Sequence, residues 1–470
     1  MELIKASKLT DSLKWSFLMV SFNFLSKFVV KIFLAKFLLP EDFGLITICF
    51  LIISLAEIIS DFGLSSVIIQ KNFKNDSKIL STIFWFSCIL GLIIFGSINI
   101  LITPIFISFY QEPVLKSLIL IVSLSLLYNP LILIHRTILH RDLDFKKIFY
   151  INVTSLIISA VISIYMAINN YGVWALVLQY FSSTLISFLF YFLSVNWKPM
   201  KTFNLSSLIS ILKKGVYDLF AKIVGYFSTY SQTIILSIYL SITDIGYFNF
   251  AMLFTISILE PFNKSIRKVF FPFFSKIKSN KDRIKENHLN QITISLCVFI
   301  PFLTFLYFYS ETLLQYLFQN KWNESVVILK YLSVFVFLKL MGGTPNVIIK
   351  SLGHFNQFFF LQLIRSLILI GFLLVGIEFY ELRGMLLAMI IAQIVLNIVD
   401  YIFLRKKISL RLIEIGLVLI KMTLLSVILI SLCYIQSHIY EVNLIFGFII
   451  CLTGYLISYL YLFKLEKIKL

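Results

Sequence analysis

Fourteen apolar runs, each long enough to cross a lipid bilayer, occupy almost the whole of this 470-residue chain. A helix needs about 20 mostly apolar residues to cross about 30 Å of hydrocarbon. Only helices and closed β-barrels satisfy every backbone polar group inside lipid. The runs are continuous rather than alternating, which favours helices over a barrel. Because only 14% of the residues are charged and the mean hydropathy is +0.95, the sequence predicts an all-α integral membrane protein with about 14 transmembrane helices.

The placement of lysine and arginine predicts how the chain is oriented. The predicted spans cover residues 12–39, 42–69, 79–107, 114–134, 148–168, 172–195, 216–240, 245–271, 289–310, 326–349, 358–377, 384–404, 412–435 and 444–463. Most of the 41 basic residues lie in alternate connections that begin with the N-terminus, whereas the other connections hold only Lys116, Lys321 and Arg383. By the positive-inside rule, both termini should be cytoplasmic. The net charge of +18 then indicates contact with anionic inner-leaflet lipids and not with nucleic acid.

Short motifs recur in the two halves of the chain. LLPEDFGLITICF opens the second span and LSITDIGYFNFAM the eighth, and NNYGVWALVL and ELRGMLLAMI open the sixth and twelfth. This repetition predicts two six-helix lobes in parallel repeat around a central cavity, plus two extra C-terminal helices. The expected divisions are 1–200, 201–405 and 406–470. Asp42 and Asp244 stand at the starts of corresponding spans, where a carboxylate is expected to cap the helix.

Charged side chains inside the spans are candidates for a transport site, because an ionisable group in hydrocarbon needs a cavity or a partner. Asn23, Lys27 and Lys31 recur every four residues on the first span and form one polar stripe. Glu57 and Asp61 are spaced in the same way on the second span. At 1.5 Å per residue, Lys27 reaches a depth similar to that of Glu57. A salt bridge within the lobe and a cationic site for an anionic substrate both fit this arrangement.

The second half of the chain carries its own intramembrane charges. Asp218 and Lys222 are four residues apart on the seventh span. Glu260 is followed by Pro261 in the eighth span, where the missing N–H is expected to bend the helix. These groups, with Asn23, Glu57 and Asp61, are predicted polar cavity residues that would also serve any coupling to H⁺ or Na⁺.

Arg365 lies roughly 15 Å inside the eleventh span if that helix begins near residue 356. Snorkelling towards the interface would explain it. However, arginine also binds phosphate through two parallel hydrogen bonds. We therefore predict Lys27, Lys31 and Arg365 as substrate-binding residues, and we expect Asp400 to pair with Arg405.

The string AKFLLPEDFGLITICFLIISLAEIISDFGLSSVIIQ, residues 35–70, resembles the signature of bacterial lipopolysaccharide and exopolysaccharide translocases. These belong to the multidrug/oligosaccharidyl-lipid/polysaccharide exporter superfamily. HRTILHRDLDFKK, NNYGVWALV and SITDIGYFNFA extend the likeness over most of residues 12–404. The resemblance implies a flippase with two six-helix lobes that opens alternately to each side. It implies that undecaprenyl-diphosphate-linked oligosaccharide, the repeat unit of O-antigen, capsule or exopolysaccharide, passes from the inner to the outer leaflet. A glycan polymerase and export machinery would then be partners.

Two other functions fit part of this pattern. A drug or small-molecule antiporter of the same superfamily, driven by Na⁺ or H⁺, would use Glu57, Asp61 and Asp218 as coupling groups. A membrane enzyme of lipid-linked glycan assembly would need a large outer loop with catalytic groups, whereas the predicted outer connections are short. The five cysteines lie inside predicted spans, with no CxxC or Cys/His cluster. The sequence therefore predicts no catalytic residue, metal site or bound cofactor.

Overall fold

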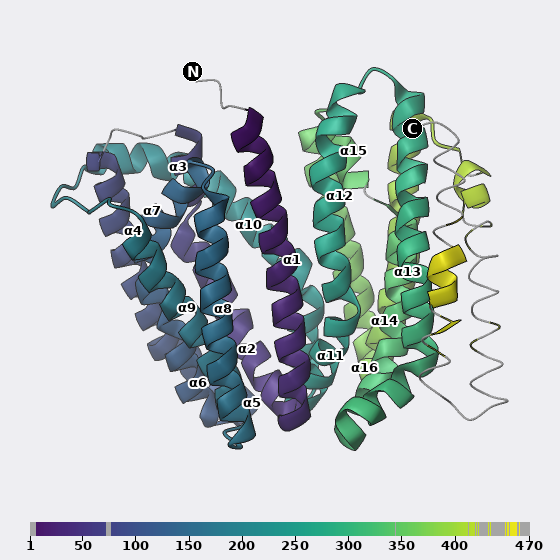
Figure 1. Cartoon of the computed structure of the whole chain (residues 1–470), viewed down its shortest axis with the longest axis horizontal. Coiled ribbons are helices and arrows are strands. Elements are labelled where there is room, and N and C mark those ends of the chain that lie inside the picture. The colour runs from purple at the N-terminus through teal and green to yellow at the C-terminus, as the bar shows by residue number, and fades with distance from the viewer. Residues whose placement is uncertain are drawn as a thin grey trace. The chain divides into compact units, whose positions relative to one another are not determined.

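The computed structural model describes residues 6–71, 77–343 and 345–411, and beyond them 413–418, 420, 422, 431, 433, 447, 449–450, 452–457 and 460. Within these residues the chain is helical and has no β-strand (Figure 1). The helices are α1 (Ala6–Phe37), α2 (Pro40–Asp61), α3 (Leu64–Lys71), α4 (Ser77–Ser97), η1 (Ile98–Ile102), α5 (Thr103–Tyr110), α6 (Val114–Ser123), α7 (Ser125–Arg141), α8 (Phe145–Ile168), α9 (Trp174–Ser194), α10 (Leu205–Tyr239), α11 (Ile242–Phe254), α12 (Ile256–Lys276), α13 (Lys281–Phe318), η2 (Gln319–Trp322), α14 (Glu324–Met341), α15 (Pro345–Ser351) and α16 (Phe355–Ile408).

Length and hydropathy confirm an all-α, multi-pass membrane protein. In the part of the chain that is described, nine helical segments are long and apolar enough to cross a bilayer, or ten if the bent pair α11–α12 is one span. The count of fourteen spans stays a prediction. Most of the last predicted pair, 412–435 and 444–463, lies outside the described residues.

One of the nine segments, α16, contains two of the predicted spans. Its helical backbone is interrupted at Tyr380 and Glu381, and Glu381 has a φ of 51°. The two arms fold back on each other. Their backbones come so close that a Cβ on Gly384 would lie 1.9 Å from the carbonyl oxygen of Gly376. This hairpin agrees with the spans predicted at 358–377 and 384–404.

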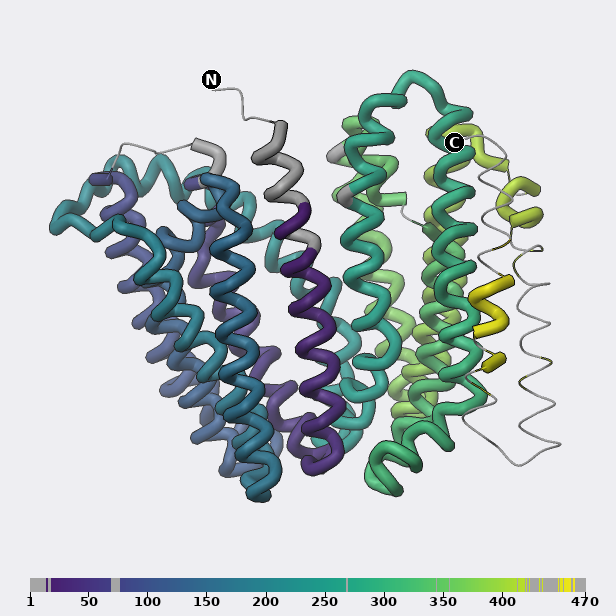
Figure 2. The backbone as a smooth tube through the Cα atoms, in the orientation of Figure 1, coloured from purple at the N-terminus to yellow at the C-terminus, as the bar shows by residue number. Residues whose placement is uncertain are grey.

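The chain separates into two compact units. The first comprises residues 1–237 and 241–246, and the second comprises 238–240 and 247–470. The predicted divisions at 200 and 405 stay predictions. In the first unit, α8 packs against both α1 and α9, and α7 packs against both α4 and α9 (Figures 1 and 2). Aromatic side chains join α1 to α8, for example Trp15 and Phe149 with ring centroids 5.3 Å apart.

In the second unit, α13 packs against α14, and α14 packs against α16. Trp322 at the end of η2 is fully buried and stacks on Phe250 with ring centroids 3.8 Å apart. Such a contact contributes about 0.5–1.5 kcal/mol beyond the apolar area that it buries. Phe274, Ile348 and Leu404 join α12, α15 and α16 in a separate apolar cluster.

Both helix caps that the sequence predicted are present. The backbone N–H of Leu39 donates to Asp42 Oδ2 over 2.8 Å, and Ser241 Oγ donates to Asp244 Oδ2 over 2.6 Å. The carboxylates thereby satisfy donors at the positive end of the α2 and α11 dipoles.

The glycines of the same two motifs allow the starts of α2 and α11 to touch. A Cβ on Gly44 would lie 1.9 Å from the carbonyl oxygen of Ile242, and one on Gly246 would lie 1.8 Å from that of Pro40. Such separations are far below van der Waals contact. Only glycine therefore fits at either position without moving a helix.

We expect Gly44→Ala to lower the free energy of unfolding by about 1–3 kcal/mol, because the added methyl group would overlap backbone. Thermal unfolding of the purified protein in detergent would measure this. Gly225→Ala is the matched control, since nothing lies within 4 Å of a Cβ built there, and replacing a helical glycine should raise stability slightly. Equal melting temperatures for the two variants would contradict the prediction.

Two of the predicted spans are interrupted. The span at 42–69 divides into α2 and α3 at Phe62 and Gly63, whose φ values of 45° and 71° are left-handed. The span at 245–271 bends by 44° between α11 and α12. The sequence predicted a bend at Pro261. The observed bend is at Thr255, one to two helical turns earlier. The ring of a helical proline clashes with the backbone one turn earlier, so its effect reaches towards the N-terminus of the helix.

Candidate functional site

The break between α2 and α3 brings Asp61 to helix α10. A Cβ on Gly63 would lie 2.4 Å from the carbonyl oxygen of Gly215, and one on Gly215 would lie 2.5 Å from that of Phe62. The backbones of the break and of α10 therefore touch, with no side chain between them. This close approach sets the carboxylate at the end of α2 beside the polar residues of α10.

Three of the predicted residues form one ion triad there. Lys222 Nζ lies 2.7 Å from Asp61 Oδ2 and 2.7 Å from Asp218 Oδ2. Ser65 donates to Asp61, and Ser66 Oγ donates to Asp218 Oδ2 over 2.9 Å. The triad carries a formal charge of about −1, so one carboxylate charge is not compensated by the lysine.

Glu57 lies one helical turn before Asp61 and has different partners. Asn129 Nδ2 donates to Glu57 Oε1 over 2.9 Å, and the Tyr180 hydroxyl donates to the same oxygen over 2.8 Å. Both donors are neutral, and they come from α7 and α9. Asp61 thus binds Lys222, and Glu57 binds Asn129 and Tyr180. A pair of either carboxylate with Lys27 stays a prediction.

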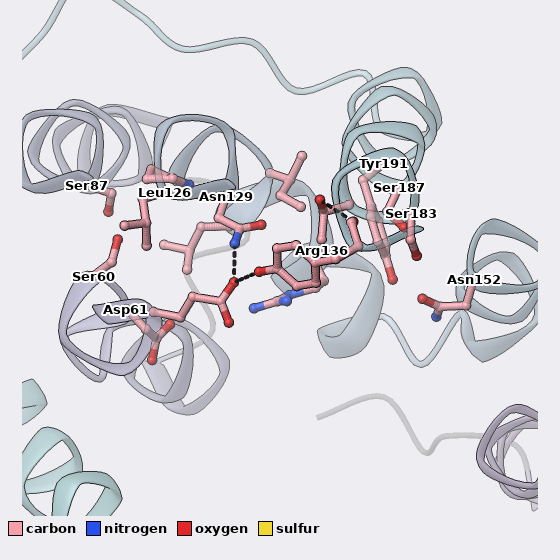
Figure 3. A pocket seen from close by; sticks show the side chains of 16 residues that line it. Ser60, Asp61, Ser87, Leu126, Asn129, Arg136, Asn152, Ser183, Ser187 and Tyr191 are labelled. Atoms are coloured by element: carbon pink, nitrogen blue, oxygen red, sulfur yellow. Dashed lines mark hydrogen bonds between the residues drawn. The ribbon is translucent and has the colours of Figure 1, made fainter. Parts of the chain in front are cut away.

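A polar cavity of about 300 Å³ lies inside the first unit, among α2, α4, α7, α8 and α9. Its charged lining residues are Glu57, Asp61 and Arg136. Figure 3 shows Ser60 and Ser87 at one end of the cavity, and Asn152 and Ser183 at the other. The rest of its polar lining consists of hydroxyl and amide groups, among them Tyr180, Thr184, Ser187, Tyr191 and Asn129.

The polar stripe of α1 is arranged as the sequence predicted, with Asn23, Lys27 and Lys31 on one continuous helix. Both lysine side chains are exposed, and Asn23 is partly buried. The Oδ1 atom of Asn23 is buried and has no hydrogen-bond partner among the residues described. Two lysines one turn apart repel each other unless an anion lies between them.

In the second unit, Arg365 is paired. Its Nη2 atom lies 3.2 Å from Asp400 Oδ2 across the α16 hairpin, and its Nη1 atom donates to Asn346 Oδ1 over 3.2 Å. The Asp400 side chain is only 3% exposed, against 20% for that of Arg365. The expected pairing of Asp400 with Arg405 was therefore wrong, because the hairpin brings a residue 35 positions away closer than the next helical turn.

Glu260 is on the surface of α12. Its Oε1 atom lies 3.1 Å from Arg267 Nη2 and 3.8 Å from Lys264 Nζ. All three side chains are at least 44% exposed. Exposed pairs of this kind contribute little to stability.

The structure unites four predicted residues in the first unit: Glu57, Asp61, Asp218 and Lys222. It adds cavity residues that the sequence reasoning missed. A readable signal was the stripe on α9 formed by Tyr180, Ser183, Thr184, Ser187 and Tyr191, whose spacing puts them on one helical face. Arg136 was missed because it was counted among the basic residues of a cytoplasmic connection. No group of three His, Cys, Asp or Glu side chains suited to a metal occurs among the described residues.

The chain belongs to the polysaccharide biosynthesis protein family, whose profile matches residues 33–327. It is 25% identical over 377 residues to the lipopolysaccharide biosynthesis protein WzxC of Escherichia coli, covering 78% of this chain and 75% of that protein. It is 22% identical over 371 residues to the succinoglycan biosynthesis transport protein ExoT of Rhizobium meliloti, covering 78% and 74%. Both relatives are thus matched over most of their length.

Solved structures share the fold. The lipid II flippase MurJ in an inward closed conformation superposes with a TM-score of 0.72 at 16% identity, over 97% of this chain and all of that one. An inward-facing multidrug transporter of the MATE family follows with a TM-score of 0.63 at 17% identity, over 82% and 94%. The predicted fold class, an all-α integral membrane protein, is thereby confirmed.

Proposed function

We propose that this chain is a flippase that moves lipid-linked oligosaccharides across the bacterial cytoplasmic membrane, from the inner to the outer leaflet. The observation that carries the proposal is membership of the polysaccharide biosynthesis protein family, with relatives named for lipopolysaccharide biosynthesis and succinoglycan transport. The structural likeness to a lipid II flippase extends over nearly the whole chain. The carrier in this proposal is a polyprenyl diphosphate, and the mechanism is alternating access.

The substrate's diphosphate would be held by Lys27, Lys31 and Arg365. The two α1 lysines support this role because they are exposed on one helical face within a membrane span. Arg365 supports it because its guanidinium has five N–H donors and its described partners, Asp400 and Asn346, use only part of that capacity.

Coupling to H⁺ or Na⁺ would fall to the carboxylates of the first unit. Asp61 and Asp218 share one lysine, whereas the hydrogen-bond donors to Glu57 are neutral. A carboxylate whose hydrogen-bond donors are neutral is held less strongly in its charged form than one that is hydrogen-bonded to a lysine. The same groups would serve an ion-coupled drug antiporter, but the MATE transporters resemble this chain in fold alone. We therefore favour the flippase. In this proposal the protein has no catalytic activity, both termini are cytoplasmic, and the inner face contacts anionic lipid.

The proposal is tested by deleting the coding sequence in the organism that makes the glycan. Lipid-linked repeat units should accumulate in the inner leaflet while surface polysaccharide disappears, and plasmid-borne wild-type chain should reverse both effects. Incubating spheroplasts with a lectin or glycosidase that cannot cross the membrane distinguishes the leaflets. Normal surface polysaccharide in the deletion strain, with no accumulated precursor, would refute the function.

A further inference from the structure

We propose that the polar cavity inside the first unit binds one neutral sugar residue of the lipid-linked glycan and thereby selects the head group. We call it the α2–α9 cavity, bounded by α2, α4, α7, α8 and α9. The inference rests on the proposed flippase function and adds a recognition site to it. This cavity lies wholly within residues 1–237 and contains none of the residues proposed to bind the diphosphate.

The cavity contains polar groups that lack protein partners. Ser87 is 1% exposed, and its hydroxyl has no hydrogen-bond partner among the described residues. The side chains of Ser183 and Ser187 are partly buried, and no described group is hydrogen-bonded to their hydroxyls. Buried polar groups are stable only when water or a ligand satisfies them. The buried hydroxyl of Ser87 and the partly buried hydroxyls of Ser183 and Ser187 therefore offer hydrogen-bonding groups to a polar occupant of the cavity (Figure 3).

The charge of the lining indicates a neutral ligand. Of the three charged residues that line the α2–α9 cavity, Asp61 is already paired with Lys222. Glu57 and Arg136 have opposite charges and compensate each other. A bound anion would be repelled by Glu57, and a bound cation would be repelled by Arg136.

The shape and chemistry of the lining indicate a sugar. Hydroxyl and amide groups both donate and accept hydrogen bonds, as the hydroxyls of a sugar do. Tyr180 and Tyr191 present aromatic rings, whose faces pack against C–H groups while their hydroxyls bond to polar ones. A volume of about 300 Å³ is at the small end of ligand pockets. This volume is large enough for one ring of a glycan.

The test uses the whole chain in lipid nanodiscs and two kinds of probe. One is undecaprenyl diphosphate alone, and the other is the same lipid carrying a single glucose, galactose, N-acetylglucosamine or N-acetylgalactosamine. We expect at least one sugar-bearing lipid to bind about tenfold more tightly than the bare lipid. We expect Ser183→Ala/Ser187→Ala to remove that difference, since two hydrogen bonds to a ligand together contribute about a factor of ten or more, and to leave binding of the bare lipid unchanged.

Ser182→Ala is the matched control. It changes a neighbouring serine of α9 that does not line the cavity and whose hydroxyl donates to the carbonyl oxygen of Leu178. It should keep the full preference for the sugar-bearing lipid. Ser187→Leu, which fills the cavity, gives an independent variant if the double variant is unstable.

Each outcome has a separate meaning. If the wild-type chain binds neither the bare lipid nor any sugar-bearing lipid, the proposed function itself fails. If it binds all five lipids equally, the flippase proposal stands and the sugar site is wrong. Retention of the sugar preference in both Ser183→Ala/Ser187→Ala and Ser187→Leu would also overturn it, because recognition would then lie outside this cavity. A Na⁺-dependent change in melting temperature that these variants remove would identify a cation site instead.

Discussion

Replacing Arg365 with alanine is expected to abolish glycan export and also to destabilise the second unit. Asp400 would keep a carboxylate that is 3% exposed, without its ionic partner. Its Oδ1 atom already lacks a hydrogen-bond partner among the described residues. Removing one partner of a buried ion pair typically costs about 3–5 kcal/mol. Surface polysaccharide in a complemented deletion strain and thermal unfolding in detergent would measure the two effects.

The double variant Arg365→Gln/Asp400→Asn separates the structural role of Arg365 from its proposed role at the substrate. It removes both charges and keeps side chains that can hydrogen-bond across the α16 hairpin, so we expect stability within about 1.5 kcal/mol of the wild type. Export should nevertheless stay absent, because the diphosphate would lose its guanidinium. Arg365→Lys should rescue export poorly, since an ammonium group cannot form the bidentate contact. If the double variant exports glycan normally, Arg365 is a structural residue only.

The fold was predictable because hydrophobic length is a local property of the sequence. Each apolar run identifies a helix by itself, without knowledge of its neighbours. The caps at Asp42 and Asp244 were predictable for the same reason, since the acceptor and the donor are three residues apart. The predicted helix boundaries were wrong where a long-range contact determines them. The break after Asp61 depends on the close approach of Gly63 to Gly215, which lies on helix α10, far along the chain.

The partners of the charged residues were much less predictable. Depth along a helix restricts which residues can meet, but it does not fix which way each helix faces. Asp400 was expected to pair with its neighbour Arg405, but it pairs with Arg365 across the α16 hairpin. Lys27 was the predicted partner of Glu57 or Asp61, and the described hydrogen-bond donors to Glu57 are Asn129 and Tyr180. Neutral polar residues gave little signal individually, and only their common face on α9 marked the cavity.

The ion triad of the first unit leads to a second large effect. Lys222→Met should lower the free energy of unfolding by about 2–3 kcal/mol, because Asp61 and Asp218 would face each other without a counter-charge. This loss of stability is smaller than that for a fully buried pair, since the side chains of Lys222, Asp61 and Asp218 are 35%, 17% and 33% exposed. Denaturant or thermal unfolding in detergent would measure it. Lys214→Met, an exposed change on the same helix, is the matched control and should stay within about 0.5 kcal/mol of wild type.

Adding Asp61→Asn and Asp218→Asn to Lys222→Met removes every charge of the triad. Most of the lost stability should then return, because the penalty comes from unpaired charge and not from missing contacts. If the triple variant is as unstable as Lys222→Met, packing rather than electrostatics explains the loss. Export by the stable triple variant tests the proposed coupling role as well. Normal export would eliminate Asp61 and Asp218 as coupling groups and leave Glu57 and Glu260 as the remaining predicted coupling carboxylates.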